Sequence, residues 1–190
     1  KRKDFVLLAI LTALYIIVYF VAMMIISLMG PFGHAISPGV CGLLSGAILI
    51  FISRKIGKMW QFTLMELIIM GVFALMGAGY LPWFITSMIG AVLADVIAST
   101  SKNPSVLKVA IASGLIHVGN ALGGIIPACF FAEQYMNEWI ARGQKPDQML
   151  EMVKATQGVM GILGTVITFI LSVIGVYIGY SILKGHLKEN

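Results

Sequence analysis

The segment 5–29, FVLLAILTALYIIVYFVAMMIISLM, decides the fold because it contains 25 consecutive residues without a charged side chain. A helix needs about 20 predominantly apolar residues to cross a lipid bilayer. Lys1, Arg2 and Lys3 precede the segment, as in a secretory signal peptide, but the apolar run is about twice the usual length of a signal peptide core. We therefore interpret residues 5–29 as a retained transmembrane helix.

The composition of the whole chain also indicates a membrane protein. Hydrophobic residues make up 59% and charged residues 11% of the 190 residues, whereas about 25% of the residues are charged in soluble proteins. We predict an all-α integral membrane protein in which residues 1–190 form one domain, a bundle of six transmembrane helices. The two cysteines, Cys41 and Cys129, are too few for a disulfide framework or a zinc site.

Turn residues and charges set the bounds of the expected helices. Glycine and proline interrupt the apolar pattern at residues 30–33 and glycine again at 77–79, and the bases Arg54, Lys55 and Lys58 end another apolar run. The second helix is expected to start after Pro38. The six expected helices cover residues 5–29, 39–53, 59–77, 81–98, 105–131 and 157–183.

One long connection remains, residues 132–156. Two clusters of apolar residues lie among charges in this segment, with Gly143 and Pro146 between the clusters. This pattern predicts two short amphipathic helices at the membrane surface. They would serve either as an interfacial aromatic anchor, because Trp139 and Tyr135 belong to residue types enriched there, or as a lid over a pocket.

The basic residues predict the orientation. With a cytoplasmic N-terminus, ten of the thirteen bases fall on the inner side: Lys1, Arg2, Lys3, Arg54, Lys55, Lys58, Lys102, Lys108, Lys184 and Lys188. The remaining three, Arg142, Lys145 and Lys154, lie in the 132–156 connection. Because cytoplasmic loops carry an excess of lysine and arginine, both termini are expected in the cytoplasm and the long loop outside.

Two acidic residues lie within the expected helices. Asp95 is near the cytoplasmic boundary, so a structural ion pair with Lys102 or Lys108 is the favoured interpretation. Glu66 lies about eight residues inside the third helix, where a carboxylate should face other helices rather than lipid. It would either link helices or act in function, and the sequence does not distinguish the two.

The strongest site candidate is on the fifth helix. His117 and Asn120 are three residues apart and share a helix face near the middle of the membrane. They would either bind a solute or form hydrogen bonds between helices. His34, in the first outer loop, is either solvated or joins Cys41 and Cys129 in a metal or haem site.

The sequence lacks the residues that several kinds of catalysis require. The chain has no Gly-x-x-x-x-Gly-Lys-Ser/Thr loop, so ATP hydrolysis would have to come from a partner. Ser45 and His117 could be imagined as an intramembrane serine protease dyad. However, Leu43 stands two residues before Ser45, where such proteases usually carry glycine. We do not expect an enzyme.

Short motifs carry a family resemblance. They are Ala9-x-x-x-Ala13 on the first helix, Arg2-Lys3-Asp4 before it, the Gly30-Pro31-Phe32-Gly33-His34 loop and the Arg54-Lys55-Ile56-Gly57-Lys58 turn. With six helices in about 190 residues and cytoplasmic termini, the whole chain resembles an S-component, the substrate-binding subunit of an energy-coupling factor (ECF) transporter. Within that superfamily it is most similar to the Trep-Strep group of integral membrane proteins.

The resemblance implies a function and a set of residues. An S-component in the bacterial plasma membrane captures a micronutrient, vitamin-like or haem-like, from outside and topples in the membrane to release it. Ala9 and Ala13 would dock on a transmembrane T-component that carries two ABC-type ATPases. No cofactor is expected in this chain, since the ATPases use the ATP and haem would be only cargo, and no nucleic acid is expected as a partner. The residues implied for the solute pocket are His34, Tyr80, Trp83, His117, Asn120, Gln157 and Met160.

A second hypothesis is a secondary transporter or channel that works without partners. It would need coupled charges along a path through the membrane. Glu66, Asp95 and His117 are the only candidates for such charges, and the sequence shows no inverted halves.

Overall fold

A computed structural model describes residues 1–187. These residues form eight α-helices and one short 3₁₀ helix, and no β-strand occurs among them. Lys188, one of the bases used for the orientation, lies outside the described residues. The helices are α1 (Arg2–Ile26), η1 (Ser27–Met29), α2 (Gly33–Lys55), α3 (Gln61–Leu75), α4 (Leu81–Ala98), α5 (Val106–Phe130), α6 (Ala132–Ala141), α7 (Pro146–Thr156) and α8 (Val159–Leu183).

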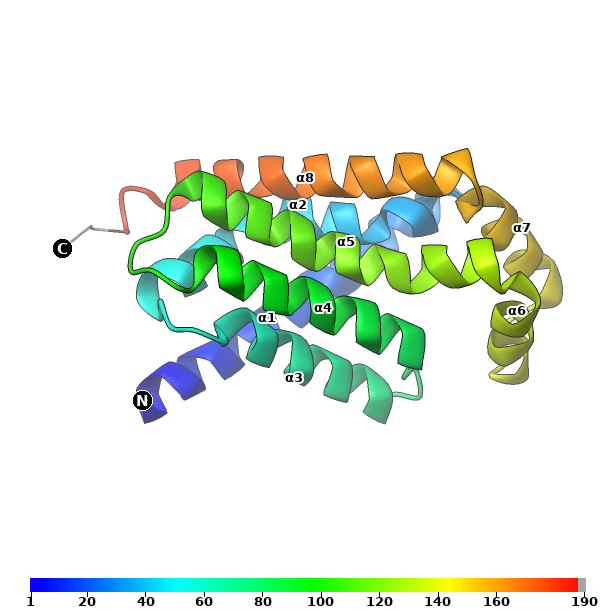
Figure 1. Cartoon of the computed structure of the whole chain (residues 1–190), viewed down its shortest axis with the longest axis horizontal. Coiled ribbons are helices and arrows are strands. Elements are labelled where there is room, and N and C mark those ends of the chain that lie inside the picture. Colours follow the sequence, from blue (N-terminus) through cyan, green and yellow to red (C-terminus); the bar gives the residue numbers. More distant parts are fainter. Residues whose placement is uncertain (188–190) are drawn as a thin grey trace.

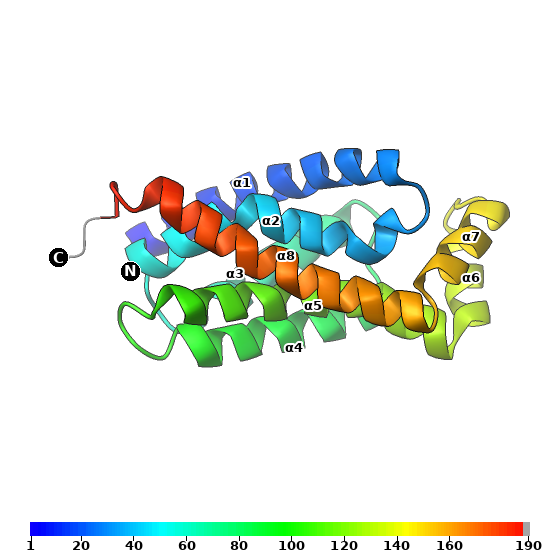
Figure 2. The ribbon, with the colours of Figure 1, turned by 90° about the horizontal axis from the view of Figure 1, so that it is seen from above.

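The helices form one elongated bundle with two different ends. Helices α1, α2, α3, α4, α5 and α8 run along its length, and α6 and α7 lie across one end (Figures 1 and 2). The start of α1 and the end of α8 lie at the opposite end, together with the α2–α3 and α4–α5 connections (Figure 1). We call these the loop-helix end and the terminal end.

Five helices are long and apolar enough to cross a membrane: α1 with η1, α2, α4, α5 and α8. Helix α3 has 15 residues, which gives a length of about 22 Å at 1.5 Å per residue, compared with about 30 Å for the hydrocarbon core. The range expected for this helix, 59–77, is longer than the observed helix, Gln61–Leu75. Trp60 and Gly77, with φ of 72° and 83°, are in left-handed backbone conformations that end the helix on both sides.

The start expected for α2 was wrong. The helix begins at Gly33 and continues through Pro38. Hydrogen bonds from residues 33–35 to carbonyls three residues earlier lead the chain from the 30–33 turn directly into the helix. Proline has the φ of a helical residue, and α2 continues past Pro38 inside the helix although the missing N–H removes one backbone hydrogen bond.

The two amphipathic helices expected in the 132–156 connection are confirmed as α6 and α7. Gly143 separates them, with a φ of 107° that favours glycine. Residues 81–98 are helical as expected. The fifth and sixth expected helices correspond to α5 and α8 within two residues at each end.

Helices α2 and α5 form the centre of the bundle. In each, 67% of the most apolar 18-residue window is buried, compared with 28% in α1. Glycines let α2 approach α8 closely, since a Cβ atom at Gly46 would overlap the backbone of Gly175. Helix α1 therefore lies at the periphery, with much of its surface free of contacts inside the chain.

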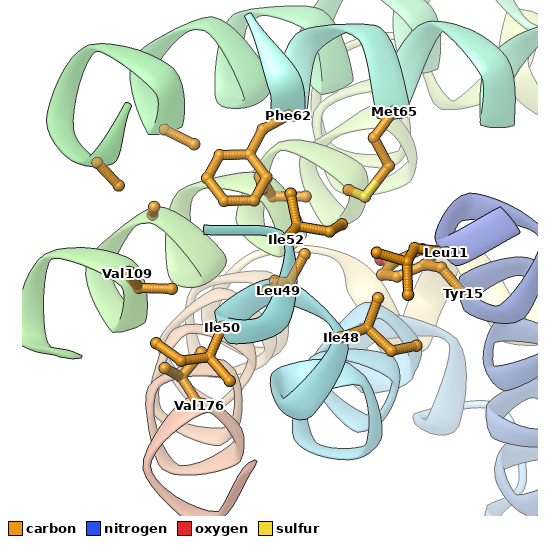
Figure 3. Close-up of a cluster of buried hydrophobic side chains, with 14 of the residues drawn as sticks. Leu11, Tyr15, Ile48, Leu49, Ile50, Ile52, Phe62, Met65, Val109 and Val176 are labelled. Carbon is orange, nitrogen blue, oxygen red and sulfur yellow. The ribbon is translucent and has the colours of Figure 1, made fainter. Parts of the chain in front are cut away.

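A hydrophobic core of buried side chains joins the long helices of the bundle (Figure 3). Its helical members come from α1, α2, α3, α4, α5 and α8, including Leu49, Ile52 and Phe62, which are almost completely buried. Side chains from six helices thus hold the bundle together.

Candidate functional site

A cavity of about 740 Å³ opens near the loop-helix end. Residues from α1 and η1, the start of α2, the end of α3, the start of α4, the second half of α5, and the α6–α7 region line it. Cavities of about 300–1,000 Å³ are typical of small-molecule sites. The cavity therefore has the size and the varied lining of a solute site.

Six aromatic side chains line this cavity in two groups. In the bundle group, the ring centroids of Tyr19 and Phe73 are 5.0 Å apart and those of Phe73 and Trp83 are 5.5 Å apart. In the interfacial group, Tyr80 lies 5.7 Å from Tyr135 and 5.6 Å from Trp139. Aromatic pairs at these separations stabilise one another, so both groups are ordered parts of the wall.

Contacts of Arg142 hold α6 against the α3–α4 connection. Its guanidinium lies 4.8 Å from the centroid of the Trp139 ring and donates a hydrogen bond to the Gly79 carbonyl oxygen. It also pairs with Glu138 at 2.8 Å. Burial raises the pKa of Tyr135 to about 12, so its hydroxyl remains protonated at neutral pH. The α6 face of the cavity is therefore positioned by specific contacts.

Polar side chains also line the cavity. Asn120 is only 6% exposed, and its Oδ1 atom has no hydrogen-bond partner among residues 1–187. His34, at the start of α2, is exposed. Gln144, Gln148 and Glu151 line the cavity from the α6–α7 side. Within the described part of the chain, no lysine or arginine is in the lining.

The structure brings four of the seven predicted pocket residues to this cavity: His34, Tyr80, Trp83 and Asn120. Gln157 instead donates from Nε2 to the Ala128 carbonyl oxygen at 2.8 Å, a bond that joins the start of α8 to α5. Met160 is 37% exposed on α8 and is not part of the lining. Several lining residues were missed, above all Tyr19, Phe73, Tyr135 and Trp139. The spacing of Tyr135 and Trp139, four residues apart on an amphipathic helix, was a signal that both share one face.

His117 has a different environment from Asn120 although the two share a helix. It is completely buried, and its Nδ1 lies 2.7 Å from the Ser113 carbonyl oxygen. Because a carbonyl only accepts, Nδ1 carries the proton, and Nε2 accepts from the Tyr15 hydroxyl at 2.7 Å. Both ring nitrogens therefore have protein partners, and His117 links α5 to α1 without reaching the cavity. Since Tyr15 occupies Nε2, the imidazole is not paired with Ser45 as a protease dyad would require.

Ala9 and Ala13 lie on the outer side of α1. Ala13 is exposed and Ala9 is partly exposed, whereas Leu8, Leu11 and Tyr15 form the buried face of the helix. The alanines therefore leave an apolar surface in the first half of α1 that the other helices of residues 1–187 do not fully cover.

The predicted ion pair of Asp95 with Lys102 or Lys108 was wrong. The carboxylate accepts hydrogen bonds from the backbone of Phe62 and Thr63 at 3.1 and 2.8 Å, and from the Thr63 and Ser99 hydroxyls at 2.6 and 2.7 Å. These backbone groups belong to the first turn of α3, whose N–H groups have no partners within the helix. The helix dipole also favours a negative charge there, so the carboxylate needs no lysine.

Two further predictions concern Glu66 and the group of His34, Cys41 and Cys129. Glu66 is outside the cavity lining and completely buried, and neither carboxylate oxygen has a hydrogen-bond partner in the described part of the chain. Residues 1–187 contain no group of three side chains arranged to hold a metal ion. Cys41 is buried and Cys129 is exposed. The alternative of a metal site built from His34, Cys41 and Cys129 is therefore not supported.

These features define a multi-pass, all-helical membrane protein with a solute-sized cavity near one end. A family model described as "Hypothetical bacterial integral membrane protein (Trep_Strep)" matches residues 2–189. The chain belongs to this Trep-Strep family. No curated protein and no solved structure shows significant similarity to it.

Proposed function

We propose that this protein is the substrate-binding subunit of an ECF-type importer in the bacterial plasma membrane. It captures a micronutrient from outside in the cavity near the loop-helix end and passes it inward with a T-component and two ATPases. The observation that carries the proposal is the separation of two features along the bundle. The Ala9 and Ala13 surface lies in the half of α1 that starts at the terminal end, and the cavity lies near the other end.

The distribution of bases supports this orientation. The start of α1, the end of α8 and the α2–α3 and α4–α5 connections lie together at the terminal end (Figures 1 and 2). These segments carry most of the bases, whereas the α6–α7 region holds only Arg142, Lys145 and Lys154. By the positive-inside rule the terminal end is cytoplasmic, so the cavity opens outward.

The position of α1 supports docking. Small residues allow two membrane helices to approach closely, and Gly46 and Gly175 already use this principle inside the bundle. Among residues 1–187, Ala9 is only partly covered and Ala13 is exposed. A coupling helix of a T-component would fill the shallow surface they leave, close to the cytoplasmic ATPases.

The structure also weakens the case for a transporter that works without partners. Of its three candidate groups, Asp95 caps α3 and His117 is bonded to Tyr15 and Ser113. Only Glu66 remains without a partner among the described residues. One buried carboxylate does not form a path of coupled charges across a membrane.

Co-purification of the intact assembly tests the proposal. The tagged wild-type chain, expressed with an ECF module, should co-purify with a T-component and two ATPases identified by mass spectrometry. Ala13→Trp should reduce their recovery at least tenfold, because the indole would fill the docking surface. Leu93→Trp, at an exposed position of α4, is the matched control and should assemble normally. Wild-type recovery with Ala13→Trp would contradict the proposal.

A further inference from the structure

We propose that the cavity selects planar nitrogen heteroaromatic solutes that carry no negative charge and rejects their anionic counterparts. This inference rests on the proposed function in one respect, that the cavity is the solute site. It narrows the micronutrient to a class defined by shape and charge. Three observations carry it: the aromatic lining, unpartnered polar groups on residues of the wall, and the charges around the cavity.

The aromatic lining favours a planar ring system. The bundle group, Tyr19, Phe73 and Trp83, comes from three helices, and the interfacial group comes from the start of α4 and from α6. Rings attract other rings in offset-stacked or edge-to-face arrangements, so aromatic pairs contribute more than the area they bury. A volume of about 740 Å³ accommodates a solute of one to three fused rings with its substituents.

Unpartnered polar groups on two lining residues favour ring nitrogens and carbonyls on the solute. The Asn120 carboxamide offers both an acceptor and a donor, and its Oδ1 has no partner among residues 1–187. The indole Nε1 of Trp139 is a buried donor that likewise has none in this range. Leaving such groups unsatisfied is costly. A heterocycle with an N–H beside a carbonyl or ring nitrogen matches both.

The charges around the cavity disfavour an anion. Its lining includes the Glu151 carboxylate and, in the described part of the chain, no lysine or arginine. Arg142 is outside the lining, where it lies over the Trp139 ring and pairs with Glu138. A buried anion without a cationic partner loses its hydration without compensation. His34 is the one lining residue among 1–187 that can become a cation, so the binding test is made at pH 8, where a histidine of ordinary pKa is neutral.

Binding of matched solute pairs to the purified full chain in lipid nanodiscs tests the inference. The pairs are nicotinamide and nicotinic acid, pyridoxine and pyridoxine 5′-phosphate, and riboflavin and flavin mononucleotide. We expect at least one uncharged member to bind with a Kd of about 10 μM or tighter, and its anionic partner to bind at least about tenfold more weakly. Equal or tighter binding of the anion overturns the inference. Failure of all uncharged members to bind also overturns it.

Two variants connect the selectivity to the cavity. Asn120→Leu should weaken binding of the uncharged solute about tenfold, while Asn137→Leu, at an exposed position of α6 outside the lining, should leave it unchanged. Trp139→Phe keeps an aromatic ring but loses the donor, and it should weaken binding about threefold. Thermal unfolding checks that each variant is folded, and Trp139→Phe carries the test if Asn120→Leu does not fold. Wild-type affinity in the folded variants overturns the assignment.

This test is independent of the assembly test. Binding is measured without T-component or ATPases, so a chain that fails to assemble can still show the selectivity. A chain that assembles normally but prefers anions keeps the proposed function and loses only the solute class.

Discussion

The two ends of the bundle are built on different principles. At the terminal end, Asp95 satisfies backbone N–H groups in the first turn of α3. At the loop-helix end, two short helices lie across the bundle beside a cavity of about 740 Å³ (Figure 1). Asn120 lines this cavity with a carboxamide oxygen that has no partner among the described residues. The terminal end is thus stabilised by a specific helix cap, whereas the loop-helix end retains space for a solute.

The largest effect is expected from removing the α3 cap. Asp95→Ala deletes a carboxylate that accepts four hydrogen bonds and leaves their buried donors unpaired. We expect the free energy of unfolding to fall by at least about 3 kcal/mol, measured by denaturant unfolding in detergent micelles. Asp147→Ala, at an exposed first-turn position of α7, should cost about 0.5 kcal/mol. Similar losses in both variants would contradict the different roles of the two aspartates.

Glycine substitutions compare the bundle interior with the cavity. Gly46→Ala places a Cβ atom against the Gly175 backbone and should destabilise the protein by about 1–3 kcal/mol. Gly124→Ala, in the cavity wall, places its Cβ 3.5 Å from the Tyr135 hydroxyl, an ordinary contact. It should leave stability unchanged or raise it by up to about 1 kcal/mol, because alanine favours helix. Thermal unfolding of the two variants measures this contrast, and equal destabilisation would show that the cavity wall is as tightly packed as the interior.

The buried pair of Tyr15 and His117 should affect stability but not binding. Tyr15→Phe leaves Nε2 of His117 without its donor and should cost about 1–2 kcal/mol. Solute affinity should stay within about twofold of wild type, since His117 does not line the cavity. Tyr177→Phe, exposed on α8, is the control for loss of a phenol hydroxyl. A large loss of solute affinity with unchanged stability would contradict this assignment and indicate that His117 belongs to the binding site.

The smallest effect on stability is expected at Arg142. Exposed ion pairs contribute about 0–1 kcal/mol, so Arg142→Ala should lower stability by less than about 1 kcal/mol. Because the side chain holds α6 to Gly79, the solute should dissociate faster, by about threefold. Stopped-flow release of bound riboflavin, or of the tightest ligand in the panel, measures this rate. An unchanged rate would favour an interfacial anchor over a lid for α6 and α7.

Local signals predicted much of the fold. The glycines at 77–79 marked the connection between α3 and α4. Gly143 and Pro146 likewise marked the break between α6 and α7. The start of α2 was missed because Pro38 was taken as a helix break, whereas the helix runs through it.

What the sequence could not provide was pairing between distant segments. Asp95 and the start of α3 are more than 30 residues apart, and Tyr15 and His117 are 102 residues apart. Most residues that line the cavity could not be predicted for the same reason. Asn120 was recognised as a polar residue in an apolar helix, whereas Tyr19 and Phe73 are indistinguishable by sequence from the aromatic residues that fill any membrane bundle.

Uptake into vesicles tests the central claim most directly. Vesicles containing only this chain should bind the tightest ligand of the solute panel but not accumulate it. Vesicles that also contain a T-component and two ATPases should accumulate the same solute when ATP is supplied to the ATPase side. Accumulation by the chain alone, without ATPase partners, would contradict the account and identify a self-sufficient transporter.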